Sequence, residues 1–274
     1  MDGVLVLGNG YLGKEFARRK FEVWGRDKFE FQELDGVYKT WKLIEPSFSK
    51  YHTIINCIAK SNTRWCEDPA NLKEALFING QLPACLSTWC RDNDKKFVHI
   101  STGCLYDDDK NINTEESFMA AHCTYTTTKW IGEKACRPER DLILRPRLLF
   151  SDVEDRNNLL CKLPNYKGYV SDKQDSLTNT TTIVAATKAL LKKKQSGIFN
   201  IAEEGSLSIA EIAEICANFG RKNVKRVRMN TIREKEGLYL VNNVMSIDKL
   251  KQFYTPFPID KIIKVCYTKL NEGK

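Results

Sequence analysis

Residues 4–13 read VLVLGNGYLG, an apolar run that leads directly into the spacing Gly-x-Gly-x-x-Gly. The apolar run predicts a buried strand, and residues 11–20 after it have the spacing of an amphipathic helix. In such a strand–loop–helix unit, Gly8 allows a tight turn, Gly10 lets the backbone approach a pyrophosphate, and Gly13 lets the helix pack on the strand. The N-terminus of the helix then offers N–H groups and a positive dipole end to phosphates. The predicted dinucleotide-binding loop comprises Gly8, Asn9, Gly10, Tyr11, Leu12 and Gly13.

The rest of the N-terminal half repeats this alternation of strand and helix. Further strands are predicted at 21–25, 52–59, 96–101 and 142–146, and helices at 68–93 and 123–136. Strands that alternate with helices indicate a parallel sheet with helices on both faces. The sequence therefore predicts an α/β fold, a Rossmann-type doubly wound parallel sheet, with residues 1–150 as the NAD(P)-binding core.

Beyond residue 150 the pattern loosens, and residues 151–274 are predicted to form a smaller substrate-binding lobe. Helices are predicted at 181–194, 206–220 and 259–270. Ser208 and Glu211 have the spacing of a capping box in the second of these helices. Residues 197–202 read as a strand that returns to the sheet, so the lobe shares elements with the core.

Composition excludes several classes of protein. The 274 residues are 42% hydrophobic and 28% charged, as in a globular domain. No apolar run approaches the roughly 20 residues of a membrane-spanning helix. The N-terminus lacks the basic segment of a signal peptide.

Cysteine, histidine and charge narrow the choice further. The ten cysteines include no CxxC pair and there are three histidines, so no metal site is expected. Reduced thiols and a cytoplasmic location are the simpler interpretation. The net charge is +8, with a basic cluster at 221–228. We interpret this cluster as a solvated face or a site for an anionic small molecule, not as a nucleic-acid or membrane surface.

The end of the second predicted strand, Trp24-Gly25-Arg26-Asp27, bears on the choice of cofactor. An acidic residue there would bind the ribose 2′-hydroxyl of NADH. Arg26 comes first, and a guanidinium suits the 2′-phosphate of NADPH. NADPH is therefore favoured, while Asp27 leaves NADH open.

Tyr125 and Lys129 form a YxxxK pair inside the predicted helix 123–136. Residues four apart share a helix face, so the ammonium can lie near the phenol and lower its pKa toward the working pH. Thr102 follows the preceding strand. Together with the dinucleotide loop, these residues indicate an oxidoreductase in which Tyr125 is the acid.

At this point the chain resembles the extended short-chain dehydrogenase/reductases, and specifically their dTDP-4-dehydrorhamnose reductase branch. The matching segments are NCIA (56–59), Asn79, STGCLY (101–106), YTTTKWIGE (125–133), LRPR (144–147), NNL (157–159) and GIFNIA (197–202). The resemblance implies that Ala59 and Lys129 also contact the cofactor. One departure is the glycine loop, which is one residue shorter than the usual GxxGxxG of this branch.

The chain is more similar still to plant-type UDP-rhamnose synthases, which are bifunctional 3,5-epimerase/4-reductases. The shared segments are Thr102-Gly103-Cys104, Trp65-Cys66-Glu67 and the Asn158-x-x-x-Lys162 spacing. The resemblance implies that Cys104 is the epimerisation base and Lys162 the acid. It implies conversion of UDP-4-keto-6-deoxyglucose to UDP-β-L-rhamnose, with Thr102, Tyr125 and Lys129 serving the reduction. A giant-virus enzyme of this kind would fit, and would act in the host cytoplasm.

Each of these residues has a plainer interpretation. Cys104 can be a core filler and Lys162 a solvated loop residue. Trp65 either packs on the sugar or is a core aromatic. Arg147 would face the nicotinamide or the substrate. Asn158 would contact the nucleotide sugar, or would simply form a turn.

Other functions also stay open. A monofunctional dTDP-4-dehydrorhamnose reductase would lack the epimerase step. A regulatory subunit that binds nucleotide without catalysis, like the β subunit of methionine adenosyltransferase, would share the fold. A nucleic-acid-binding relative would use the 221–228 cluster. The resemblance further implies a possible homodimer.

Overall fold

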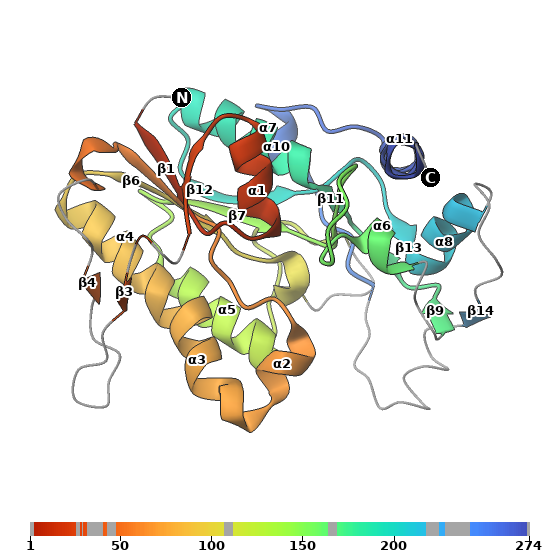
Figure 1. Ribbon diagram of the computed structural model, residues 1–274, viewed down its shortest axis with the longest axis horizontal. Coiled ribbons are helices and arrows are strands. Elements are labelled where there is room, and N and C mark those ends of the chain that lie inside the picture. The colour runs from red at the N-terminus through yellow and green to blue at the C-terminus, as the bar shows by residue number, and fades with distance from the viewer. Residues whose placement is uncertain are drawn as a thin grey trace. The chain divides into compact units, whose positions relative to one another are not determined.

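The computed structural model of the chain describes residues 3–25, 28, 30–31, 41–42, 48–106, 112–163, 169–217, 225–227 and 242–272. The chain forms two compact units (Figure 1). The first consists of residues 1–105, 120–145 and 191–199, and the second of residues 106–119, 146–190 and 200–274. The division is therefore not a single boundary near residue 150, because the chain passes between the units several times.

The first unit contains most of a six-stranded sheet with flanking helices, which confirms the predicted α/β fold. Its order is β12-β7-β6-β5-β1-β2, and the pairs β1–β2, β1–β5, β5–β6 and β6–β7 are parallel. The strands are β1 (Val4–Leu7), β2 (Glu22–Trp24), β5 (Thr53–Asn56), β6 (Lys96–Ile100), β7 (Leu142–Pro146) and β12 (Gly197–Ile201). A separate antiparallel pair joins β3 (Glu30–Phe31) and β4 (Trp41–Lys42).

The strand order places a topological switch point beside β1. β1 lies between β2 and β5, so the chain reverses direction across the sheet after β2. In open α/β sheets, ligands bind at the carboxyl ends of the strands beside such a switch point. The loops after β1 and β5 are therefore the expected cofactor site.

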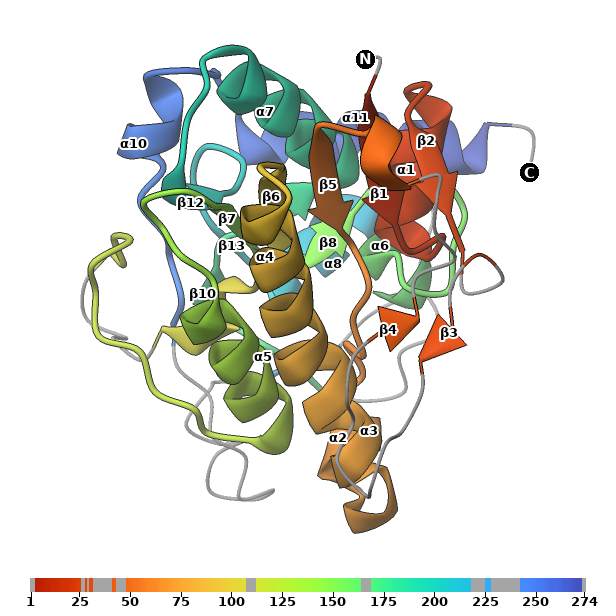
Figure 2. The ribbon, with the colours of Figure 1, turned by 90° about the vertical axis from the view of Figure 1, so that its left-hand side faces the viewer.

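Helices cover this sheet and bury its apolar side chains. They are α1 (Tyr11–Arg18), α2 (Thr63–Glu67), α3 (Leu72–Leu76), α4 (Leu82–Asp92) and α5 (Thr124–Ala135). Figure 2 shows α4 and α5 side by side. Leu82, Leu86 and Cys90 of α4 pack against apolar residues of β1, β5, β6 and β7 in one core cluster. Burial of these side chains supplies the main stabilisation of the layer.

The long helix predicted at 68–93 is broken into pieces, which corrects that expectation. Asp68 caps a short 3₁₀ turn (Pro69–Asn71), and a π-helical turn (Phe77–Gln81) separates α3 from α4. Further 3₁₀ turns lie at Phe48–Lys50 and Gly103–Leu105. The π-helical turn carries the buried Asn79, whose amide bonds outside its own helix. Such turns inside helices occur frequently at functional sites.

The second unit has its own apolar core, formed by residues such as Phe150, Ile212 and Ile263. Its helices are α6 (Leu159–Lys162), α7 (Thr180–Lys192), α8 (Ile209–Ala217), α10 (Asp248–Lys251) and α11 (Ile259–Asn271). Its short strands are β8 (Leu149–Phe150), β9 (Tyr169–Ser171), β10 (Gln174–Asp175), β11 (Thr178–Asn179), β13 (Leu207–Ser208) and β14 (Lys225–Val227). The capping box is confirmed, because Ser208 N–H donates to Glu211 Oε2 and Glu211 N–H donates to Ser208 Oγ.

The described ranges lack two features that would indicate other functions. There, no helix is long and apolar enough to span a bilayer. The same part of the chain shows no group of three or more His, Cys, Asp or Glu side chains that could hold a metal ion.

The packing of α1 on the glycine loop leads to a first prediction. A Cβ on Gly13 would lie 1.8 Å from the Gly8 carbonyl oxygen, whereas a Cβ on Gly10 would have no atom within 4 Å. Gly13→Ala must therefore displace α1, and we expect it to lower the free energy of unfolding in urea by about 3 kcal/mol. Gly10→Ala is the matched control, and it should stay within about 0.5 kcal/mol of wild type. Equal stability of the two variants would contradict the packing described here.

Candidate active site

The glycine loop has the geometry of a phosphate cradle. Gly8 has φ of +104°, which residues with a side chain rarely adopt, and its N–H donates to the Trp24 carbonyl at 2.8 Å. Gly10 is the N-cap of α1 and supplies no side-chain cap for the helix N–H groups. Asn9 and Gly10 are exposed, and the space a Gly10 side chain would fill is open. Phosphate oxygens fit this space, with α1 donating from its first turn.

The loop after β5 lies directly beside the glycine loop. A Cβ on Gly8 would lie 3.1 Å from the Ile58 nitrogen. The Asn56 side chain holds this loop, because its Oδ1 accepts the Ile58 N–H at 3.1 Å. Ala59, predicted to contact the cofactor, is exposed in the same loop. Arg26 and Asp27, on which the choice between NADPH and NADH depends, lie outside the described residues.

The segment after β6 carries Thr102 and Cys104. Thr102 is buried, and its Oγ1 accepts the Cys104 N–H at 3.2 Å. This bond leaves the Thr102 hydroxyl hydrogen free to donate elsewhere. Cys104 is half-buried in a 3₁₀ turn. The role of Cys104 as a base stays a prediction.

Tyr125 and Lys129 lie one turn apart on α5, as the spacing predicts. Tyr125 is half-buried, whereas Lys129 is buried and its Nζ donates to the Ile100 carbonyl at 2.7 Å. That bond ties the lysine to the end of β6, two residues before Thr102. The structure thus places Thr102, Cys104 and Lys129 at the carboxyl end of one strand.

The N-terminus of α5 is held by a carboxylate from α2. Glu67 accepts the Thr124 N–H at 2.7 Å and the Thr124 hydroxyl at 3.0 Å. Cys123 and Thr126 complete a capping box at the same end. These contacts fix the first turn of α5, where Tyr125 lies. In the sequence, Glu67 belongs to a segment shared with the resembling family. Its role in holding α5 follows only from these contacts.

Asn79 holds α5 one turn further along, at Thr128. Its amide donates to the Lys60 carbonyl at 3.0 Å and to Thr128 Oγ1 at 3.1 Å, and its Oδ1 accepts the Lys60 N–H at 2.9 Å. Gly132 lets the two segments approach, since a Cβ there would lie 2.0 Å from the Asn79 carbonyl oxygen. The chain after β5 and the helix that carries Lys129 are therefore joined through one side chain.

Burial controls the charge of Lys129. Loss of hydration lowers its pKa to about 8, and the Glu133 carboxylate opposes part of that fall. The same burial lowers the pKa of His99 well below its usual range, so that imidazole is neutral. Burial raises the pKa of the Cys57 thiol. The pKa of Lys129 therefore lies close to physiological pH, and Glu133 is the carboxylate that acts on it.

Trp65 lies on α2 and is half-buried. The Lys60 ammonium lies 4.2 Å from the centre of its ring and also pairs with Glu74 at 2.8 Å. A cation on the ring holds Trp65 in place. Contact between Trp65 and a sugar stays a prediction.

The remaining candidates belong to the second unit. Arg147 donates from Nε and Nη2 to Asp175 Oδ1 at 2.8 and 2.7 Å, and Lys173 binds the same carboxylate. Arg147 is therefore engaged within the protein, and its predicted role toward nicotinamide or substrate stays a prediction.

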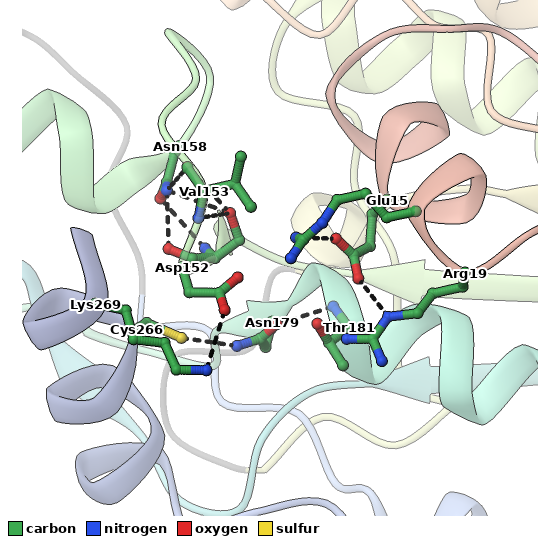
Figure 3. Close-up of polar contacts among 11 residues, drawn as sticks. Glu15, Arg19, Asp152, Val153, Asn158, Asn179, Thr181, Cys266 and Lys269 are labelled. Carbon is green, nitrogen blue, oxygen red and sulfur yellow. Dashed lines mark hydrogen bonds and ion pairs between the residues drawn. The ribbon is translucent and has the colours of Figure 1, made fainter. Parts of the chain in front are cut away.

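Asn158 is wholly buried and acts as the N-cap of α6 (Figure 3). Its Oδ1 accepts the Leu160 N–H at 3.1 Å, and its Nδ2 donates to the Ser151 and Val153 carbonyls at 2.9 and 2.7 Å. These bonds favour the turn-forming interpretation over contact with a nucleotide sugar. Lys162 ends the same helical turn and is exposed. The Asn-x-x-x-Lys spacing is thus a cap followed by one turn of helix.

Comparison with known proteins agrees with this geometry. The family model described as the RmlD substrate binding domain matches residues 2–237. A trifunctional UDP-glucose 4,6-dehydratase/UDP-4-keto-6-deoxy-D-glucose 3,5-epimerase/UDP-4-keto-L-rhamnose reductase of Arabidopsis thaliana is 25% identical over 70% of this chain. The chain spans about a third of that relative, since the match covers 30% of it. A bifunctional dTDP-4-dehydrorhamnose 3,5-epimerase/reductase of the same plant is 25% identical over 73% of this chain and 68% of its own length.

Solved structures share the fold over nearly the whole chain. The dTDP-4-dehydrorhamnose reductase of Bacillus anthracis, in complex with NADP, has a TM-score of 0.76 at 19% identity and covers 98% of both chains. The UDP-rhamnose synthase of Acanthamoeba polyphaga mimivirus has a TM-score of 0.76 at 18% identity, over 97% of this chain and 98% of its own.

The buried ammonium predicts a pH dependence of stability. The folded chain releases the Lys129 proton at about pH 8, whereas an ordinary lysine releases it at 10.5. Between these values the unfolded chain binds more protons, so this residue makes stability rise with pH. Lys129→Met removes that contribution. We expect wild type to gain up to about 1.4 kcal/mol per pH unit on the variant above pH 8, measured by urea unfolding. Parallel profiles for the two proteins would show that Lys129 is not desolvated.

Proposed function

The chain belongs to the RmlD substrate-binding domain family, and from this premise we propose that it is an NADPH-dependent nucleotide-sugar 4-keto reductase that also epimerises its substrate. The substrate we propose is UDP-4-keto-6-deoxyglucose and the product is UDP-β-L-rhamnose. The observation that carries the proposal is the grouping of Thr102, Cys104 and Lys129 at the end of β6, with Tyr125 one turn before Lys129. A plain reductase needs no thiol at that place.

The open space beside Gly10 and the helix N-terminus behind it fit the pyrophosphate of a dinucleotide. Lys129 would hold the nicotinamide ribose, and Arg26 would bind the 2′-phosphate. When bound, NADPH supplies the hydride for C4 of the sugar. The Bacillus anthracis relative, which holds NADP, supports this choice of cofactor.

The protein's own residues would act on the ketone in two stages. First, the Cys104 thiolate removes a proton from C5 and then from C3, and electrons move onto the C4 oxygen to give an enolate. Thr102 and Tyr125 donate hydrogen bonds to that oxygen, a stabilisation of roughly 3–4 kcal/mol per donor. Lys162 returns a proton to each carbon on the opposite face, and solvent restores the thiolate and the ammonium. Second, Tyr125 gives its phenolic proton to the C4 oxygen as hydride reaches C4.

The UDP preference rests on the named relatives. The Arabidopsis trifunctional protein and the mimivirus enzyme act on UDP sugars by their names, and both match this chain. A dTDP-specific reductase without epimerase activity is the alternative.

The test follows the reaction by NMR in D2O with NADPH and UDP-4-keto-6-deoxyglucose. We expect deuterium at C3 and C5 of UDP-rhamnose. Cys104→Ser should lower that exchange by roughly 10²–10⁴-fold, because a general base is lost. Tyr125→Phe should abolish reduction and also slow exchange, because it removes both the proton donor for the C4 oxygen and one hydrogen bond to the enolate oxygen. Reduction of an unexchanged sugar would mean a plain reductase. No NADPH oxidation with either UDP or dTDP substrate would favour a regulatory nucleotide-binding protein.

A further prediction concerns the cofactor. Gly10→Ala places a methyl group in the proposed phosphate space without touching other atoms, so stability should hold while NADPH affinity falls by about tenfold or more. Arg26→Ala should weaken NADPH binding and leave NADH binding nearly unchanged, because one charge-assisted phosphate contact is lost. Fluorescence titration of both cofactors gives the Kd values. Tighter binding of NADH than of NADPH by wild type would refute the choice of NADPH.

A further inference from the structure

Directly behind the proposed site lies a buried ion pair that the reaction scheme does not use. Glu133 of α5 and Arg145 of β7 are both buried, and Arg145 is 0% exposed. Arg145 Nε donates to Glu133 Oε2 and Oε1 at 3.0 and 3.2 Å, and its Nη2 donates to Oε1. The Ser101 hydroxyl also donates to Glu133 Oε2. One carboxylate therefore collects bonds from β7 and from the end of β6.

The residues that bind Glu133, and Glu133 itself, are close neighbours of the functional residues along the chain. Ser101 immediately precedes Thr102, and Glu133 lies one turn after Lys129 on α5. Lys129 is itself bound to the Ile100 carbonyl. Two neighbouring bonds thus join α5 to the end of β6, one from an ammonium and one to a carboxylate.

Stability alone does not account for this pair. Taking two charges out of water costs several kcal/mol per ion, and well-packed apolar replacements of buried ion pairs are often neutral or stabilising. The Glu133 carboxylate lies one helical turn from the buried Lys129 ammonium, and it raises the pKa of that lysine.

The groups that act electrostatically on Lys129 come from three parts of the sheet and helix layer. They are Glu133 on α5, Cys136 at its C-cap, Cys57 after β5, His99 on β6 and Cys104 after β6. Burial raises the pKa of the Cys57 and Cys136 thiols, and it keeps the His99 imidazole neutral. Among these described groups Glu133 is the carboxylate, and Arg145 and Ser101 donate hydrogen bonds to it.

We propose that Glu133, fixed by Arg145 and Ser101, is a positioning residue that keeps Lys129 an ammonium at the end of β6. The role of that ammonium toward the cofactor and Tyr125 rests on the proposed function. The charge of Lys129 itself does not, because it can be measured in the protein without substrate.

The test titrates lysine carbons by NMR in protein labelled with ¹³C at lysine Cε. The Lys129 signal is identified by its absence in Lys129→Met. We expect it to titrate at about pH 8 in wild type. In Glu133→Gln/Arg145→Met, which removes both charges and keeps an amide acceptor for Ser101, the midpoint should fall by about one pH unit or more. Ser101→Ala removes one hydrogen bond that fixes Glu133 and keeps both charges, so its midpoint should fall by less than that of the double variant.

Glu133→Asp provides a second arm, because it keeps the charge but moves it one methylene away from Lys129. Its midpoint should fall by less than that of the double variant. Unchanged midpoints in both Glu133 variants would overturn the proposal. A protein that titrates as expected but turns over no nucleotide sugar would leave this inference intact and refute the proposed function alone.

Discussion

Helix α5 can approach its neighbours only because one position on it has no side chain. At Gly132, a Cβ would lie 2.0 Å from the Asn79 carbonyl oxygen. This close approach brings the Asn79 amide within reach of Thr128 and of the Lys60 backbone. The same approach buries the inner face of α5, so that Lys129 and Glu133 must find partners inside the protein. The site is therefore a consequence of how closely a helix and a π-helical turn can pack.

The sequence was sufficient for the parts of the fold that depend on local pattern. The apolar runs at β1, β5, β6 and β7 alternate with helical segments, and that alternation predicted a parallel sheet. The Ser208–Glu211 capping box was likewise predicted, since both partners lie within one turn. The break in the helix at 68–93 was not predicted. Asn79 supports the π-helical turn through bonds to residues 19 and 49 positions away, which no local window contains.

The candidate site likewise contains residues that a local pattern predicts and residues that depend on distant partners. Tyr125 and Lys129 were found from their spacing, and the order Thr102–Cys104 from its place after a strand. The sequence did not indicate a role for Glu133, Arg145 or Glu67, because each of them bonds to a residue 12 to 57 positions away along the chain. Glu133 carried one signal that was available, its four-residue spacing from Lys129 on the same helix face. For Asn158, the sequence suggested contact with a ligand, whereas the structure shows its side-chain amide bonded to nearby backbone carbonyls.

The capped turn that contains Lys162 is as short as a helix can be. Asn158 fixes where it begins, and the lysine is its last residue. Each residue in a helix turns the chain by about 100°. Adding or deleting a single residue between the cap and Lys162 would therefore swing the ammonium about a quarter of the way around the axis. Such a length change would alter the direction of the Lys162 side chain but leave its charge and its neighbours in the sequence almost unchanged. In this segment, the number of residues therefore matters more than their identity.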